Sequence, residues 1–390
     1  MGMHSHRRAE PDSVLALRLA LAVVAPMGVI TLVAMILLWP AASSPSRGEV
    51  ADDVHGTVAK IMREPCPEQL PDDVNGCGSA QVRLDDASGK RVTIQVPLPN
   101  GTGAPEVGTG DDVVLIRSSS PDGVVFTIVD HQRSAGLWTV GAAFVLALVA
   151  FGRWRGVTAL AGLGVTFAIL LLFVIPAILA GESPLLVAIV GSAAIMLTVL
   201  YLTHGFSVST SVAVLGTLIS LTLTGALSAV AVAALHLTGV TDDLSAAVGM
   251  QQVNTQGLLL AGIVIGALGV LDDVTVTQAV TVSELARANP RYSTREVYRA
   301  ASRVGRAHIA SVVNTIILAY AGSSLPLLIL IVSADTSLGA VITDQVVAQE
   351  LVRSAVATLG LIAAVPVTTV LAALVATRDP GPPRQSVGRP

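Results

Sequence analysis

The chain has 390 residues, of which 52% are hydrophobic, 13% are charged and 3% are aromatic, and its formal net charge is −4. A soluble domain carries about 25% charged residues, so this composition excludes an ordinary soluble enzyme and a disordered chain. The negative charge and the scarcity of aromatic rings also exclude nucleic acid as a partner. Histidine aside, Glu182 is the only charged residue between Val157 and Thr241. The sequence therefore predicts a mainly α-helical, polytopic protein of the lipid bilayer.

Eight apolar stretches are candidates for helices that span a membrane, which takes about 20 apolar residues; the second is short and is expected to begin a few residues earlier. Arginine marks the loops that stay in the cytoplasm. With both termini inside, 14 arginines fall on cytoplasmic segments, whereas the short outer loops contain no Lys or Arg. We therefore expect a multi-pass protein of the cell (plasma) membrane with cytoplasmic N- and C-termini. The stretches are Leu19–Trp39, Gly136–Phe151, Val157–Ala180, Pro184–Leu202, Val208–Leu237, Gly257–Thr281, Ile309–Ser333 and Leu351–Thr377.

Residues 1–40 are interpreted as a cytoplasmic tail followed by a signal-anchor helix. A cleaved signal peptide is the alternative, because basic residues precede the first stretch and small residues follow Pro40. An apolar core of about 21 residues is longer than the roughly 7–15 residues of a cleaved peptide, which favours the anchor. Residues 136–377 would form a seven-span membrane domain, and residues 378–390 a second cytoplasmic tail.

Residues 41–135 differ from the rest of the chain, with 14 acidic and 8 basic residues and frequent Gly and Pro. Five short β-type runs separated by turn residues predict a small all-β barrel of the OB or SH3-like kind on the extracytoplasmic side. The sequence does not choose between these two barrels. The runs are His55–Ile61, Ala80–Leu84, Arg91–Val96, Asp112–Arg117 and Val124–Val129.

The only two cysteines, Cys66 and Cys77, lie eleven positions apart in this β domain. The expected outer compartment is oxidising, so we expect a disulfide, which stabilises such a loop by about 2–3 kcal/mol. Two free thiols are the alternative. A zinc site is not favoured, because one Cys pair without nearby His supplies too few ligands, and whether the chain binds any metal stays open.

Two carboxylates stand in the sixth stretch, where Asp272 and Asp273 follow an apolar run, Gly257–Leu271, of only 15 residues. That run is too short to cross the bilayer, so the helix must carry the acids into it. Their side chains point about 100° apart around the helix, and at least one is expected to face the bundle, where it can bind a proton or a cation. The alternative is that the pair marks the inner helix end. The sequence does not decide which of the two matters.

Three neutral side chains complete the predicted ion site. Asn314 and Thr315 in the seventh stretch are expected at a depth similar to that of Asp272, and Gln278 follows on the sixth stretch. Their oxygens can coordinate a cation, but amide and hydroxyl groups also form ordinary hydrogen bonds between membrane helices.

A smooth face on the sixth stretch is predicted from Gly262, Gly266 and Gly269. Small residues at this spacing let another helix approach closely. The face would pack within the bundle or against a second copy in a homo-oligomer.

A basic cytoplasmic helix is predicted at about residues 285–308. Ser293 and Glu296 fit a capping box, and four following arginines share one helix face. Anionic lipid headgroups are the expected partner of this face, and an acidic protein partner is the alternative. The arginines are Arg295, Arg299, Arg303 and Arg306.

Several ordered strings carry a resemblance to a known family. They are GALGVLDD (266–273), RVGR (303–306), NTIILAYAGSSLP (314–326), ELVR (350–353) and AVPVTT (364–369). Together they resemble the YibE/F-like membrane proteins. The resemblance implies a polytopic protein with about seven spans in its main domain, and it implies no settled biochemical activity.

The leading hypothesis for function is a permease, or an ion- or proton-coupled transporter, that uses the intramembrane carboxylates. A non-transporting membrane scaffold or sensor is the second hypothesis, with the outer β domain binding an envelope ligand or partner. No P-loop, H-E-x-x-H or G-x-S-x-G motif is present, so we expect neither an enzyme nor a cofactor. The identity of a transported solute or ion is not determined by the sequence.

Overall fold

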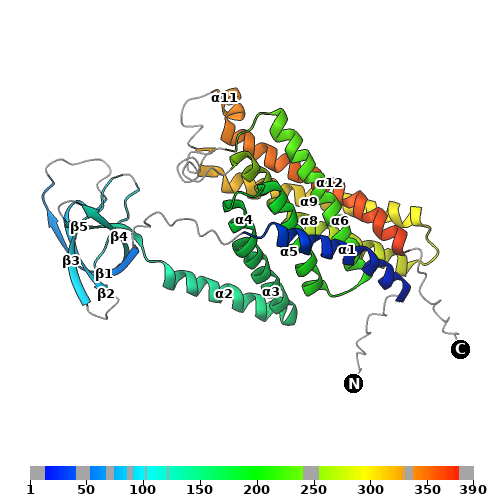
Figure 1. Cartoon of the computed structure of the whole chain (residues 1–390), viewed down its shortest axis with the longest axis horizontal. Coiled ribbons are helices and arrows are strands. Elements are labelled where there is room, and N and C mark those ends of the chain that lie inside the picture. Colours follow the sequence, from blue (N-terminus) through cyan, green and yellow to red (C-terminus); the bar gives the residue numbers. More distant parts are fainter. Residues whose placement is uncertain are drawn as a thin grey trace, which may run out of the picture. The chain divides into compact units, whose positions relative to one another are not determined.

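The computed structural model describes residues 14–40, 53–66, 74–85, 91–101, 103–120, 123–239, 254–326, 328–329 and 337–376. The chain divides into two compact units. One comprises Ser43–Gly156, and the other combines Met1–Ala42 with Val157–Pro390. Each unit is described by itself (Figure 1).

The first unit contains a five-stranded antiparallel sheet with the strand order β3-β2-β1-β4-β5. The outer strands β3 and β5 also lie in contact, so the sheet curls into a half-barrel. Each of the five predicted runs overlaps one strand, and the expected small all-β domain is confirmed. The strands are β1 (Asp53–Glu64), β2 (Cys77–Asp85), β3 (Arg91–Pro97), β4 (Asp112–Ser120) and β5 (Gly123–His131).

Alternating side chains build the core of the half-barrel. Ala80, Val82 and Leu84 of β2 are buried, as expected when every second residue of a strand faces one side. In β1 the register shifts between Val58 and Lys60. Such a bulge bends a strand, which lets β1 pair with β4 through its first half and with β2 along most of its length.

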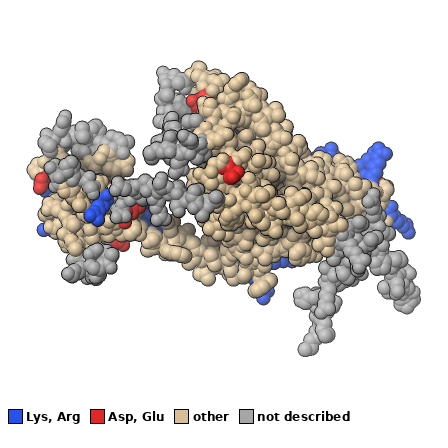
Figure 2. Space-filling view, viewed as in Figure 1, with Lys and Arg blue, Asp and Glu red and all other residues tan. Residues whose placement is uncertain are grey.

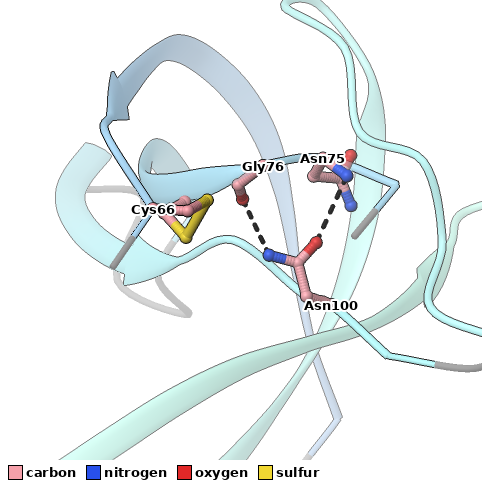
Figure 3. The surroundings of a disulfide bond; sticks show 5 residues. Cys66, Asn75, Gly76 and Asn100 are labelled. Atoms are coloured by element: carbon pink, nitrogen blue, oxygen red, sulfur yellow. Dashed lines mark hydrogen bonds between the residues drawn. A yellow bond between two sulfur atoms is a disulfide. The ribbon is translucent and has the colours of Figure 1, made fainter. Parts of the chain in front are cut away.

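The cysteines are joined next to a tightly bonded loop. Cys66 and Cys77 form a disulfide with a Cα–Cα distance of 5.1 Å. Beside it, the Asn75 backbone N–H donates to Asn100 Oδ1 at 3.2 Å, and Asn100 Nδ2 donates to the Gly76 carbonyl at 2.7 Å (Figure 3). These bonds fix the start of β2 against the chain that follows β3.

A long apolar helix, α2 (Ser134–Gly152), follows β5 in the same unit. None of its side chains is buried within the described structure. Just before it, Arg133 donates to Asp130 at 2.6 Å. This hydrogen bond holds the pKa of the Asp130 carboxyl below its ordinary value.

The second unit is a helical bundle. Its centre is formed by α6, α8 and α12, which run side by side (Figure 1), with α5 against α8, α9 against α12 and α8, and α1 across α5 and α6. The helices are α1 (Val14–Leu37), α3 (Trp154–Ile169), the π turn η1 (Leu170–Val174), α4 (Ile175–Leu179), α5 (Pro184–His204), α6 (Val208–Ala234), α8 (Thr255–Ala288), α9 (Thr294–Ser323), α11 (Leu338–Thr343) and α12 (Gln345–Ala376).

Within the described residues, seven helices are long and apolar enough to cross a membrane. The first unit supplies α2. The second supplies one span made of α3, η1 and α4 in succession, and five further spans, α5, α6, α8, α9 and α12. The helix α1 adds a shorter apolar segment, Leu21–Leu37. The predicted mainly helical architecture of membrane type is therefore confirmed.

Several helix boundaries differ from the sequence-based expectation. The helix α12 begins at Gln345 and not at Leu351, and α9 ends at Ser323 and not at Ser333. The sixth predicted span ends at Thr281, but α8 continues to Ala288. The seventh begins at Ile309, whereas α9 already begins at Thr294, behind the predicted Ser293 capping box, which is confirmed. The basic stretch and the seventh span are thus one helix, because apolar and small residues at a spacing of four bury its first half against the bundle. These residues are Val297, Ala301 and Gly305.

Candidate ion site in the helical bundle

A file of buried hydroxyl groups runs along α6. Thr217, Ser220, Thr224 and Ser228 are all fully buried, and their spacing of three or four residues places them on one helix face. Each hydroxyl donates to the carbonyl four residues earlier. The donors are therefore satisfied within α6, and the hydroxyl oxygens can still accept a hydrogen bond. Sequence reasoning missed this file, although the spacing was visible.

Close contacts between glycine and threonine join α6 to α12. A Cβ at Gly216 would overlap Thr368, and a Cβ at Gly360 would overlap Thr224. The missing side chains let the two helices approach closely. Thr368 Oγ1 is buried and has no hydrogen-bond partner in the described structure.

Gln278 ties three helices together. Its side chain is 3% exposed, and its Nε2 donates to Thr369 Oγ1 of α12 at 2.7 Å and to the Ala301 carbonyl of α9 at 3.1 Å. Both amide hydrogens are thereby used, so the geometry gives this predicted site residue a role in holding helices together.

A hydrogen bond between hydroxyls sets the register of α8 against α6. Thr217 Oγ1 and Thr275 Oγ1 lie 2.6 Å apart, and Gly225 of α6 faces Val264 of α8. These contacts place Asp272 level with the stretch between Thr217 and Ser220. This stretch is about 14–18 Å from the first residue of α6 and about 21–26 Å from the last, at 1.5 Å per residue.

Asp272 is therefore in the middle third of the bundle, not at a helix end. Its side chain is partly buried, and Oδ1 is fully buried without a hydrogen-bond partner in the described structure. No arginine, lysine or histidine forms an ion pair with it among the described residues. The carboxylate oxygen thus retains the capacity to bind a proton or a cation.

Asp273 points to the other side of α8. It is exposed on the bundle surface and follows Gly262, Gly266 and Gly269 at intervals of four, three and four, which is the spacing of one helix face. The two adjacent acids therefore have different surroundings. Only Asp272 is directed toward the packed interior.

Asn314 and Thr315 lie near the level of the two acids but are not brought together with them. The Gly266 backbone faces the Tyr320 hydroxyl, and Gln278 faces Gly305. These two contacts set Asn314 within about one helical turn of the Asp272 level. Both α9 side chains are exposed, and the Thr315 hydroxyl donates to the Ser311 carbonyl of its own helix at 3.2 Å.

Other charged groups of the bundle lie along α9 and in the first turns of α12. Glu350 and Arg353 of α12 form an ion pair at 3.1 Å. The sequence-predicted arginines of α9 are exposed, and Figure 2 shows basic side chains gathered at one end of an otherwise largely uncharged helical surface. These four are Arg295, Arg299, Arg303 and Arg306.

The half-barrel carries a separate surface pocket of about 760 Å³. Arg63, Glu106 and Asp111 line it, and His131 Nε2 lies 2.8 Å from the Glu106 carbonyl at its edge. Among the described residues no three His, Cys, Asp or Glu side chains come together in a way that would hold a metal ion.

Fold and site together define a polytopic helical membrane protein with a carboxylate inside its bundle and an appended β half-barrel. Residues 140–378 match the family described as YibE/F-like protein. The match covers more than half of the chain, which belongs to this family. No curated protein and no solved structure matches the chain.

Proposed function

We propose that this protein is a permease, coupled to protons or to another ion, in which Asp272 carries the transported charge. The observation that supports the proposal is the Asp272 carboxylate in the middle third of the bundle, whose buried Oδ1 has no hydrogen-bond partner in the described structure. Ionisable groups at such depth are costly in a membrane and usually mark ion pathways.

The geometry favours a site on the inner face of α8 over one between α8 and α9. Thr275 lies one turn from Asp272, and its hydroxyl contacts both the Asp272 carbonyl at 3.2 Å and Thr217 of the hydroxyl file. Hydroxyl oxygens of this kind can accept a hydrogen bond from a proton carrier or coordinate a desolvated cation. A single carboxylate balances one positive charge, which favours a proton or a monovalent cation over a divalent metal.

In the proposed topology eight helices span the plasma membrane, and both termini lie in the cytoplasm. The half-barrel then lies on the extracytoplasmic side. The exposed arginine face of α9 would then contact anionic lipid headgroups at the cytoplasmic surface. No catalytic step and no cofactor belongs to the proposal.

A membrane scaffold or sensor is the alternative function. The pocket at Arg63, Glu106 and Asp111 supports it, because a depression with both charges can bind a polar envelope ligand or partner. This alternative assigns no role to Asp272.

Flux measurements separate the two functions. Purified full-length protein in sealed vesicles with an internal pH dye would be challenged with Na⁺, K⁺, Mg²⁺, Zn²⁺ and small polar solutes. We expect a solute-dependent pH change that falls by about 100-fold in Asp272→Asn, the range seen when an essential proton-transfer group is removed.

Asp273→Asn is the matched control. It makes the same chemical change one residue away, about 100° around α8 on the exposed face, and we expect it to retain most of the flux. Equal losses of flux in both variants would mean that the transport site includes the outer face of α8. Absence of flux with every solute, in protein shown to be folded, would favour the scaffold or sensor.

A further inference from the structure

The outer face of α8 is uncovered in the described structure. No atom lies within 4 Å of a Cβ built at Gly262 or Gly269, and at Gly266 only the Tyr320 hydroxyl does. Asp273 is exposed on this same face. The surface is thus a glycine face that ends in a carboxylate.

The depth of this carboxylate makes contact with lipid unfavourable. The register with α6 puts Asp273 in the middle third of the bundle, like Asp272. A charged side chain facing hydrocarbon there is strongly disfavoured, and such groups normally face protein or water. The face is therefore expected to be covered in the membrane.

A complementary polar group lies on the same surface. Asn314 is exposed on α9 within about one helical turn of the Asp273 level, and Tyr320 lies where α9 borders the glycine face. The Asn314 amide can donate two hydrogen bonds. Both groups are exposed, and no hydrogen bond joins them within the described part of the chain.

We propose that two copies of this chain associate through this surface, with Asp273 accepting from Asn314 of the partner subunit and the reverse. Copies inserted in the same orientation present each residue at the same depth, and a two-fold axis along the membrane normal makes such contacts reciprocal. An axis through α8 itself would oppose two Asp273 carboxylates, so the axis lies between α8 and α9.

The glycines explain how the subunits come close enough. With no side chain at Gly262 and Gly269, α9 of the partner subunit packs against the α8 backbone, as small residues allow in membrane helix pairs. Because this inference concerns the outer face of α8, it does not depend on the proposed transport function.

Association in bilayers tests the proposal. Two differently labelled populations of full-length protein would be mixed in vesicles, and energy transfer would be followed as lipid is added. We expect dimers for the native chain. Gly269→Leu should raise the dissociation constant by at least about tenfold, because the new side chain fills the space that the partner helix needs.

Gly164→Leu is the matched control, since Gly164 is also exposed on a membrane helix with nothing within 4 Å. It should leave the dissociation constant unchanged. Both leucines fit the single chain, so a loss of dimer specific to Gly269→Leu is not a folding defect. A monomeric native chain, or equal effects of the two leucines, would overturn the proposal.

Cysteine crosslinking tests the reciprocal contact. One population would carry Asp273→Cys and the other Asn314→Cys, while Cys66 and Cys77 are already joined to each other. Oxidation should give a crosslinked pair of chains. Ile219→Cys, exposed on α6 at the same depth, should give none with either partner. A crosslink through Ile219 but not between positions 273 and 314 would contradict the proposal.

Discussion

The inner side of the bundle, where α6, α8 and α12 meet, differs from the outer face of α8 in what its small and polar residues do. On the inner side threonines pack directly against Gly216 and Gly360, so the space that a side chain would take is already filled. On the outer face Gly262 and Gly269 meet nothing. Similar residues therefore pack the fold in one place and leave a surface for binding in the other.

The adjacent acids show the same contrast. Asp272 turns toward the interior and keeps an unpartnered buried oxygen, whereas Asp273 is exposed beside the glycines. A rotation of about 100° between successive residues of a helix is enough to separate them. The difference indicates that Asp272 acts in the interior of the bundle and Asp273 acts at its exposed surface.

The largest expected effect on stability comes from filling an inner glycine. Gly360→Leu would force a side chain into Thr224 and part α12 from α6, which should destabilise the protein by about 3 kcal/mol or more. Gly262→Leu on the open face should be neutral or slightly stabilising. Thermal unfolding in detergent measures both, and equal melting temperatures would remove the contrast between the two faces.

A smaller effect is expected from the inner polar bonds. Gln278→Leu removes the donors to Thr369 and to the Ala301 carbonyl, and it should cost about 2 kcal/mol because buried acceptors are left unsatisfied. The control is Thr277→Val on the exposed side of α8, expected to be within about 0.5 kcal/mol of the native chain. Chemical denaturation would compare them, and equal stability of both variants would show that the Gln278 bonds contribute nothing.

The smallest effect concerns the hydroxyl pair that sets the register. Thr275→Val deletes the contact with Thr217 and should cost about 0.6 kcal/mol, the average for hydrogen bonds between membrane helices. Thr222→Val, exposed on α6 and bonded only within its own helix, gives the baseline. A cost of several kcal/mol at Thr275 would mean that this contact does more than align α6 with α8.

Local patterns predicted the elements well. Short β-type runs between turn residues located the five strands, the Ser293–Glu296 pair located the start of α9, and long apolar runs located the membrane helices, because each of these signals depends on neighbours in the sequence. The extension of α8 to Ala288 and the continuation of the basic stretch into the seventh span were missed, since polar residues near a membrane boundary weaken the apolar signal without ending the helix.

The sequence by itself determined the class of protein, its family, the two-part organisation and the presence of acids within a span. Only the tertiary structure decided which side each acid faces, that Gln278 bonds to α9 and α12, and that Asn314 is exposed. The physical reason is that helix orientation depends on the shapes of all neighbouring helices at once. Contacts such as Gly360 with Thr224 join residues more than a hundred positions apart, and no local pattern in the sequence reports them.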